Sequence, residues 1–287
     1  MSGNNSNRKP PVVVLVAGSY PRIEQAAVKL RPVIEEHAEI VLWDRDFADD
    51  LSTIEEDALV IVLGGDGSML RAARHMGENQ RPVLGVNLGK LGFLADVPPN
   101  ELPQVLPAVL RGECRVVPHM MFNCELQRDG KAIHQVLGLN EVTVFAGPPF
   151  ALLRIDLHVD GDLATSYSAD GLVISTPVGS TGHSLSAGGP IIRKHLQAFV
   201  INPLNPHTLT NRPVVDSAEH VFEMHVPHPH EGTTVVVDGQ PLCTLKPEDR
   251  VIVRKAEPCF QIVEIPGRTY YRTLREKLGW GGRLTKA

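Results

Sequence analysis

Apolar runs and helix-like segments alternate over the first 112 residues of the chain. The run 58–63 is not interrupted by a polar residue, which is typical of a strand buried on both faces. Runs of the same kind predict strands at 12–16, 40–43, 58–63 and 83–86. Helical spacing and helix-opening prolines predict helices from Pro21, after Ser68 and over 99–110. This βαβ series predicts an α/β domain with a parallel sheet over residues 1–112.

The pattern changes near residue 113. Ile155, Leu157 and Val159 alternate with polar neighbours, as in a strand with one solvent-exposed face. Asp-Gly pairs, which often close β-hairpins, stand at 129–130, 160–161 and 238–239. These features predict an all-β second domain over 113–265. The remaining segment, 266–287, contains a predicted helix at 271–278, and we expect this tail to pack back on the N-terminal domain.

Charge and hydropathy exclude several classes of protein. A net charge of −5 gives no general attraction to nucleic acid or to an anionic membrane, so we expect neither as a partner. No apolar run approaches the ~20 residues of a membrane span, and residues 1–10 lack the apolar core of a signal peptide. We therefore expect a cytoplasmic protein with a short disordered N-terminal tail.

Several familiar sites are poorly supported. The cysteines contain no C-x-x-C pair, so neither a zinc site nor a disulfide framework is predicted: Cys114, Cys124, Cys243 and Cys259. The histidines at 225, 228 and 230 are interleaved with prolines, which favours an exposed loop over a metal site. There is no G-x-G-x-x-G fingerprint and no Walker loop. A hydrolase triad of His183, a nearby serine and Asp170 lacks the G-x-S-x-G pattern.

The glycine-rich segment 64–68 joins a predicted strand to a predicted helix. Glycines let the backbone approach a phosphate closely, and the free N–H groups of a helix start favour an anion. We predict phosphate contacts from these positions: Gly64, Gly65, Gly67, Ser68 and, one turn into the helix, Arg71. Asp66 is unusual here, because phosphate repels a carboxylate unless it accepts a proton or holds a metal. A tight turn in which Asp66 only caps the helix is the simpler alternative.

Hydroxyl-bearing and glycine residues dominate a second segment, 175–190. It lies between the apolar runs 172–174 and 191–192, so a polar, closely approachable backbone is held between rigid elements. Such a segment suits contacts with adenine, ribose or phosphate. A loop without function is the alternative, although ordered loops of this length are uncommon.

Taken in order, these and further motifs resemble the bacterial NAD kinase family. They are Gly64–Ser68, Asn87–Leu94, Asn140–Glu141, Ser168–Gly171, the segment 175–190 and the closing Thr273–Trp280. The resemblance implies ATP-dependent phosphorylation of the 2′-hydroxyl of the adenosine ribose of NAD, giving NADP. It also implies a Rossmann-like N-terminal domain, a β-sandwich-like C-terminal domain, an active site between them, and a homodimer or homotetramer. The implied partners are NAD and ATP, with a divalent metal ion, expected to be Mg²⁺, bound with ATP rather than by protein ligands alone.

The resemblance also implies roles for single residues. Asp66 matches the catalytic carboxylate, and a ribose hydroxyl is a poor nucleophile that benefits from such a base. NAD contacts are implied for Asp66, Gly67, Asn140, Glu141, Ser168, Asp170, Thr181, Gly182, His183, Ser184, Leu185, Ser186 and Gln240. Asn140 offers both a donor and an acceptor to a sugar hydroxyl pair.

Two departures from the family pattern leave questions open. The glycine loop ends in Ser68 where the family usually has Thr, and Gly182-His183 replaces the usual Ala-Tyr. The second change leaves undecided whether NAD or NADH is the preferred substrate. The sequence also leaves open the range of phosphoryl donors and feedback by NADPH. Two other functions are kept as alternatives. A lipid kinase would share the glycine loop but need an apolar groove, and a non-catalytic NAD sensor would bind without turnover.

Overall fold

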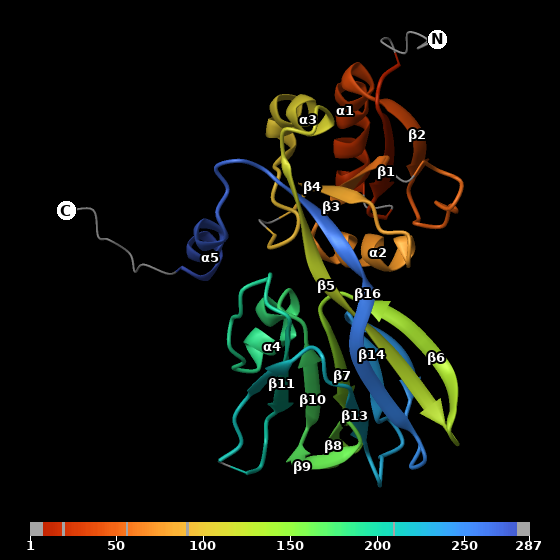
Figure 1. The fold of residues 1–287 in the computed structure, drawn as a ribbon, viewed down its shortest axis with the longest axis vertical. Coiled ribbons are helices and arrows are strands. Elements are labelled where there is room, and N and C mark those ends of the chain that lie inside the picture. Colours follow the sequence, from red (N-terminus) through yellow and green to blue (C-terminus); the bar gives the residue numbers. More distant parts are fainter. Residues whose placement is uncertain (1–7, 19–20, 56, 90–91, 209, 280–287) are drawn as a thin grey trace, which may run out of the picture. The chain divides into compact units, whose positions relative to one another are not determined.

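The computed structural model describes residues 8–18, 21–55, 57–89, 92–208 and 210–279. Most of the predicted disordered tail and the end of the motif Thr273–Trp280 lie outside the described residues. The chain divides into two compact units (Figure 1): unit 1 is Met1–Pro118 with Gln261–Ala287, and unit 2 is His119–Phe260. The division falls within two long strands, β5 (Arg115–Arg128) and β16 (Arg250–Glu264).

Unit 1 is built on a parallel sheet with the strand order β2-β1-β3-β4, and the end of β16 pairs with β4. The strands are β1 (Pro11–Val16), β2 (Glu39–Asp44), β3 (Leu59–Gly64) and β4 (Pro82–Asn87). Each lies within one residue of its predicted range at either end. Strand β3 is buried along its whole length, which explains its unbroken apolar sequence.

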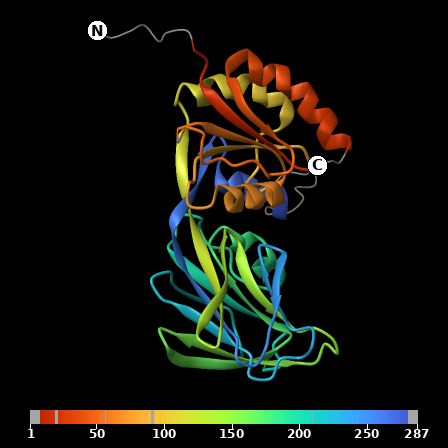
Figure 2. The ribbon, with the colours of Figure 1, turned by 90° about the vertical axis from the view of Figure 1, so that its right-hand side faces the viewer.

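Helices cover both faces of this sheet (Figure 2). Helices α1 (Pro21–His37) and α3 (Leu102–Leu110) lie on one face, where Ile34 and Leu106 share a core with Ile61 of β3. Helix α2 (Asp66–Met76) lies on the other face, where Met69 approaches Gly85 of β4. The predicted helix 99–110 is divided into a 3₁₀ turn (Pro99–Glu101) and α3. The predicted tail helix is α5 (Tyr270–Leu278).

The strand order places a topological switch point between β1 and β3. The chain leaves β1 toward a helix on one face and leaves β3 toward a helix on the other, so the two connections diverge. The strand ends stay side by side, because the N–H of Ala17 donates to the carbonyl of Leu63 at 3.0 Å. Ligands of open α/β sheets bind at such a point. Here the position is occupied by the glycine segment 64–68.

Unit 2 contains two β-sheets. One has the order β6-β5-β16-β13-β8-β9 and the other the antiparallel order β12-β11-β10-β7-β14-β15. The first sheet adds β6 (Lys131–Gly138), β8 (Leu153–Val159), β9 (Asp162–Ala169) and β13 (Phe222–His225) to the long strands. The second contains β7 (Glu141–Phe145), β10 (Gly171–Ser175), β11 (Ala198–Leu204), β12 (Val214–Ser217), β14 (Thr234–Val237) and β15 (Gln240–Thr244).

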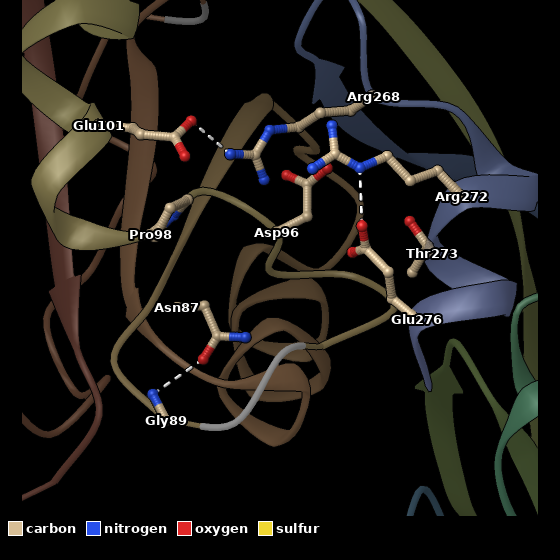
Figure 3. Close-up of a pocket in the computed structure, with 9 residues that line it drawn as sticks. All are labelled: Asn87, Gly89, Asp96, Pro98, Glu101, Arg268, Arg272, Thr273 and Glu276. Carbon is tan, nitrogen blue, oxygen red and sulfur yellow. Dashed lines mark hydrogen bonds and ion pairs between the residues drawn. The ribbon is translucent and has the colours of Figure 1, made fainter. Parts of the chain in front are cut away.

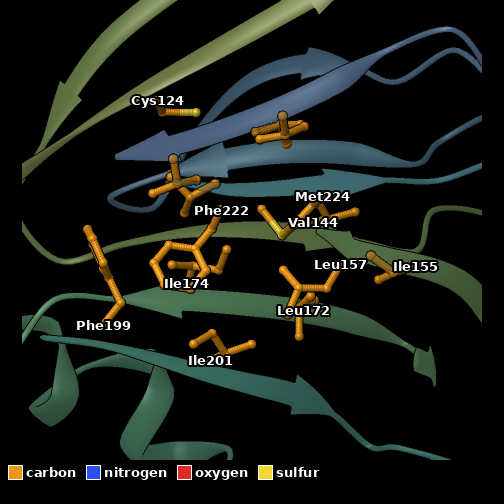
Figure 4. Packing of buried hydrophobic residues seen from close by; sticks show 14 of the residues in the cluster. Cys124, Val144, Ile155, Leu157, Leu172, Ile174, Phe199, Ile201, Phe222 and Met224 are labelled. Atoms are coloured by element: carbon orange, nitrogen blue, oxygen red, sulfur yellow. The ribbon is translucent and has the colours of Figure 1, made fainter. Parts of the chain in front are cut away.

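Side chains from both sheets form one core (Figure 4). Phe222 of β13 meets Phe199 of β11 edge to face, with ring centroids 5.5 Å apart. Ile155 of β8 and Ile174 of β10 are fully buried in the same cluster. The sheets therefore stack as a sandwich, as the resemblance implied.

The predicted Asp-Gly hairpins are confirmed. The pairs 129–130, 160–161 and 238–239 connect β5 to β6, β8 to β9 and β14 to β15 as two-residue turns. Both residues of each pair have φ between +48° and +89°. Positive φ at both positions is the requirement of a type I′ turn, which Asp-Gly meets with little strain.

Unit 2 also contains helical turns that the expectation of an all-β domain missed. The segment 175–190 includes a 3₁₀ turn (Gly179–Thr181) and the one-turn helix α4 (His183–Ser186). Both are short and rich in glycine and serine, so they carry no apolar periodicity that would predict a helix. Among the described residues, no helix combines the length and hydropathy needed to cross a membrane.

Gly85 is a test of how tightly α2 is held on the sheet. A Cβ at this position would lie 2.8 Å from Ala95 Cα and 2.9 Å from Met69 Sδ. We expect Gly85→Ala to lower the free energy of unfolding by about 1–3 kcal/mol, because either α2 or the loop that contains Ala95 must shift to make room for the methyl group. Gly67→Ala is the matched control, since nothing lies within 4 Å of a Cβ there and alanine favours the helix. Equal urea midpoints for both variants would contradict this packing.

Candidate functional site

The glycine segment 64–68 places the start of α2 directly after the carboxyl end of β3. The N–H of Gly65 donates to the Ser68 hydroxyl oxygen at 3.2 Å. Gly64 has no room for a side chain, since a Cβ would lie 2.1 Å from that oxygen. Gly67 is exposed in the first turn, and the N–H groups of Asp66 and Gly67 precede the first helical hydrogen bonds, which Ser68 and Met69 donate to the carbonyl of Gly65. The turn therefore offers donors and a helix dipole to an anion.

Asp66 is held by backbone donors from the next loop. Its Oδ2 accepts from the N–H of Phe93 at 2.7 Å, and its Oδ1 accepts from Leu94 at 2.9 Å and Ala95 at 3.1 Å. A Cβ at position 92 would lie 2.1 Å from Oδ1, so Gly92 is needed for this approach. The carboxylate is thus fixed by main chain rather than acting only as a helix cap, and about one third of the side chain remains exposed.

Asn87 shapes the loop that supplies these donors. Its Nδ2 donates to the carbonyl of Ala95 at 2.9 Å, and its Oδ1 accepts from the N–H of Gly89 at 2.8 Å. The N–H of Leu88 donates to the carbonyl of Gly64 at 3.0 Å. Lys90 and Leu91, which the motif Asn87–Leu94 contains, lie outside the described residues. The buried Asn87 side chain therefore ties both ends of the loop to β4 and the glycine segment.

The side chain of Arg71, which was predicted to contact phosphate, contacts Asp46 and Phe47 instead. Its guanidinium donates to the carbonyl of Asp46 and lies 4.6 Å from the ring centroid of Phe47. These contacts belong to the loop after β2. A phosphate contact from Arg71 would require the side chain to leave both partners.

A pocket of about 290 Å³ lies beside the Asn87 loop in unit 1 (Figure 3). Arg268 donates to Glu101 at 2.5 Å, and Arg272 donates to Glu276 at 2.8 Å. Asp96 points toward both guanidinium groups in the close-up. Each of these arginines is thus already paired with a carboxylate of the wall, and a bound anion would have to compete with it.

In unit 2, the Asn140–Glu141 pair is held by Asp238. The Asp238 carboxylate accepts from the N–H groups of Leu139 and Asn140, both at 2.8 Å, and from that of Glu141 at 3.1 Å. Thr176 completes the arrangement, because its N–H donates to the carbonyl of Asn140 at 2.8 Å. The backbone around the pair is therefore satisfied without using either of its side chains.

The segment 175–190 folds against this pair. A Cβ at position 179 would lie 2.1 Å from the carbonyl oxygen of Asn140, so only glycine allows the contact. A Cβ at position 182 would lie 3.2 Å from Glu141 Oε2. The Thr181 hydroxyl donates to the carbonyl of Val178 at 3.1 Å and is thereby used within its own turn. The structure therefore brings Asn140, Glu141 and the segment 179–182 together.

Helix α4 carries His183, Ser184, Leu185 and Ser186 at the end of this segment. His183 stacks on Phe145 of β7, with ring centroids 5.3 Å apart and an angle of 19° between the planes. Burial lowers the pKa of the His183 imidazole, so the ring is mostly neutral at pH 7. A planar ring is thus retained where the family usually has Tyr.

Polar atoms without partners gather in this part of unit 2. Asn140 Oδ1, Glu141 Oε2 and Ser184 Oγ are buried, and none has a hydrogen-bond partner among the described residues. Buried polar atoms are almost always paired in native proteins, and unpaired ones suggest that a ligand or water completes them. These three residues are all members of the predicted NAD contacts.

The Glu141 side chain is a neutral acid near pH 7. Burial raises its pKa to about 8, the nearby Asp238 carboxylate adds to the rise, and the N–H of His183 opposes it. Of the two neighbouring carboxyl groups, Asp238 accepts three backbone N–H groups and Glu141 keeps its proton. A protonated Glu141 can donate as well as accept a hydrogen bond, which suits a sugar hydroxyl.

Two predicted contacts lie away from this group. Strand β10 pairs with β7 so that Ser175 faces Glu141 and Gly171 faces Phe145, which puts Asp170, five residues from Ser175, roughly 17 Å along the sheet from Glu141. Asp170 Oδ2 accepts from the Asn205 side chain at 2.9 Å. Ser168 lies in β9, beyond this end of β10. Within one chain, the structure does not bring either residue to the Asn140–Glu141 pair.

Gln240 lies at the nearer end of the sheet. It pairs with Val237, whose partner in β7 is Val142, next to Glu141. Its side chain is exposed.

Sequence reasoning missed the residues that hold others in place. The sequence predicts Asp238 only as part of a hairpin turn, and the one signal for its second role is its place two residues before the predicted contact Gln240. Thr176 is included only as a member of the hydroxyl-rich segment 175–190, and Phe145 belongs to no predicted motif. Their contacts join segments that are distant in sequence, and no local pattern predicts such partners.

Two family models match the chain. The model described as the ATP-NAD kinase N-terminal domain matches residues 11–114, and that described as the ATP-NAD kinase C-terminal domain matches residues 139–265. An NAD kinase of Rhodopirellula baltica is 52% identical over 277 residues, covering 96% of this chain and 89% of that protein. An NAD kinase of Geobacter sulfurreducens is 40% identical over 256 residues, covering 88% and 89%.

Solved structures have the same fold. A yeast NADH kinase complexed with NADH superposes with a TM-score of 0.81, covering 98% of this chain and 91% of that chain. Its sequence identity is 22%, so this likeness is one of fold. An NAD kinase from Archaeoglobus fulgidus in complex with ATP has a TM-score of 0.67 and 25% identity, covering 94% and 97%.

The neutral Glu141 predicts a particular pH dependence of stability. Its pKa is raised in the folded chain, so between its ordinary value of 4.5 and about 8 the unfolded chain loses a proton that the folded chain keeps. Stability should therefore fall as pH rises through this range, by about 1 kcal/mol per pH unit. Glu141→Gln cannot ionise and should remove this contribution.

Urea unfolding of the wild type and the variant at pH 5, 6, 7 and 8 measures the difference, in which other titrating groups cancel. Glu231→Gln, the same change at an exposed glutamate of unit 2, is the control and should leave the slope unchanged. Parallel stability curves for the wild type and Glu141→Gln would show that Glu141 is charged in the folded protein.

Proposed function

Because the chain belongs to the ATP-NAD kinase family, we propose that it transfers the γ-phosphoryl group of ATP to the 2′-hydroxyl of the adenosine ribose of NAD. The product is NADP, and the enzyme is a phosphotransferase. The observation that carries the reaction chemistry is the Asp66 carboxylate, fixed at the start of α2 by three backbone N–H groups. The relatives and solved structures named above are NAD kinases or an NADH kinase, so the alternatives of a lipid kinase and a non-catalytic sensor are not favoured.

Asp66 is assigned as the general base. The 2′-oxygen forms a bond to the γ-phosphorus, the bond from that phosphorus to the β–γ bridging oxygen breaks, and ADP leaves with the electron pair. The proton of the 2′-hydroxyl passes to Asp66. General-base assistance contributes about 10²- to 10⁴-fold to such a step. The glycine turn Gly64–Ser68 supplies N–H groups to the phosphate oxygens, and phosphoryl transfer depends largely on such positioning and neutralisation of charge.

The NAD-binding group is assigned to unit 2. The unpaired atoms of Asn140, Glu141 and Ser184 support hydrogen bonds with ribose hydroxyls or with the adenine edge. The remaining assigned contacts come from the likeness alone: Asp66 and Gly67 of unit 1 and, in unit 2, Ser168, Asp170, Thr181, Gly182, His183, Leu185, Ser186 and Gln240.

A divalent metal ion is expected with ATP, and we assign Mg²⁺. In the part of the chain that the structure describes, no group of three or more His, Cys, Asp or Glu side chains is arranged to hold a metal. Mg²⁺ commonly binds through substrate phosphates, water and at most one or two carboxylates, so the proposed ion would be held mainly by the nucleotide. It would neutralise charge on the phosphates. The likeness further leads us to propose a cytoplasmic homodimer or homotetramer.

Asp66→Asn tests the proposed chemistry. The wild type should form NADP from NAD with ATP and Mg²⁺, and the variant should lose about 10²- to 10⁴-fold in kcat because an amide cannot take the proton. NADP formation is followed with a dehydrogenase that uses only NADP. Asp57→Asn, the same change at an exposed aspartate just before β3, is the matched control and should keep wild-type activity.

NAD binding and the melting temperature are measured for each protein, because Asp66 also orders the loop 93–95. A wild type that binds NAD but makes no NADP would support the sensor. Wild-type turnover in a folded Asp66→Asn variant would show that Asp66 is not the general base, but it would not contradict the proposed kinase function.

A further inference from the structure

The helix α5 brings a lysine to the proposed base within unit 1. Lys277 Nζ lies 3.8 Å from Asp66 Oδ2 and 4.2 Å from the ring centroid of Phe93. About one fifth of the Lys277 side chain is exposed, against about one third of that of Asp66. The ammonium group is thus placed by two contacts and partly shielded from solvent, which strengthens its electrostatic effect.

Contacts elsewhere on α5 fix this position. Leu274, one turn before Lys277, is 1% exposed. The Thr269 hydroxyl oxygen caps the helix by accepting from the N–H of Arg272 at 3.3 Å. Arg268, just before the helix, forms the 2.5 Å ion pair with Glu101. Lys277 is therefore carried to Asp66 by an anchored helix.

The hydrogen bonds of Asp66 leave one direction open. Two backbone N–H groups occupy Oδ1, but only that of Phe93 occupies Oδ2, so a lone pair of Oδ2 remains for a proton or a hydroxyl. The 3.8 Å separation from Lys277 is too long for a hydrogen bond. Lys277 therefore lies beside Asp66 Oδ2 and leaves that oxygen free to accept a proton.

A carboxylate at this place repels the phosphate that must approach it, and a cation next to its free oxygen offsets that repulsion. Resting on the kinase function proposed above, we propose that Lys277 is a further catalytic residue, whose ammonium group contacts the terminal phosphate oxygens of the phosphoryl donor during transfer. Lys277 takes no proton and forms no bond in this step. Its positive charge would stabilise the negative charge of the phosphoryl group as that group passes Asp66 during in-line transfer.

Lys277→Met is the main test, since methionine keeps the length and helix propensity of lysine but removes the charge. We expect kcat to fall roughly 10- to 100-fold, with the KM for NAD and the melting temperature near those of the wild type. Lys277→Arg should recover most of the activity. Added ethylammonium should restore part of the activity of Lys277→Ala, which a purely structural role would not allow.

Arg275→Met is the matched control, because Arg275 is exposed on the same helix and the substitution also removes one positive charge. It should leave kcat unchanged. A wild-type kcat in Lys277→Met, with Asp66→Asn inactive, would overturn this inference and leave the kinase intact. Loss of activity that neither arginine nor the amine restores would assign Lys277 a structural role and also overturn it. A wild type that forms no NADP removes the proposed function and this inference together.

Discussion

The site in unit 1 depends on one interaction, the acceptance of three backbone N–H groups by the Asp66 carboxylate. This interaction joins the glycine turn after β3 to the loop after β4, two segments that lie at the carboxyl end of the same sheet. The other features of the region serve it. Asn87 folds the donor loop, and the absence of a side chain at Gly85 and Gly92 lets the loop reach the helix. The carboxylate proposed as the base is thus held by main chain, which leaves it fewer alternative positions than side-chain partners would.

In unit 2, too, an aspartate carboxylate accepts three backbone N–H groups, but the consequence is different. Asp238 accepts three consecutive N–H groups and sets the backbone of Asn140 and Glu141. Burial raises the pKa of the neighbouring Glu141 and the charge of Asp238 adds to the rise, so Glu141 keeps its proton. Two carboxyl groups in a small volume thereby take separate parts, one structural and one available to a ligand.

Local patterns were sufficient to predict most of the fold. The buried strands of unit 1 are unbroken apolar runs, and the three Asp-Gly turns have the chemistry of their turn type, so each carries its own signal. The short turns at 179–186 carry none, because serine and glycine favour them without an apolar period. The placement of the candidate site was predictable only in part. The glycine turn and the Asn-Glu pair stand out in the sequence, whereas Asp238, Thr176 and Lys277 act through contacts across long stretches of chain.

The division of the chain has a consequence for its synthesis. Unit 2 is inserted within unit 1, so the last strand and the last helix of unit 1 leave the ribosome after all of unit 2. Until then β4 has no neighbour on the side where β16 will pair, and a parallel edge is left open. A domain that is continuous in sequence can fold as soon as it has been translated, but unit 1 cannot complete its sheet until unit 2 has also been translated. A nascent chain interrupted before residue 261 would therefore contain the glycine turn and Asp66 in a sheet that still lacks its final strand.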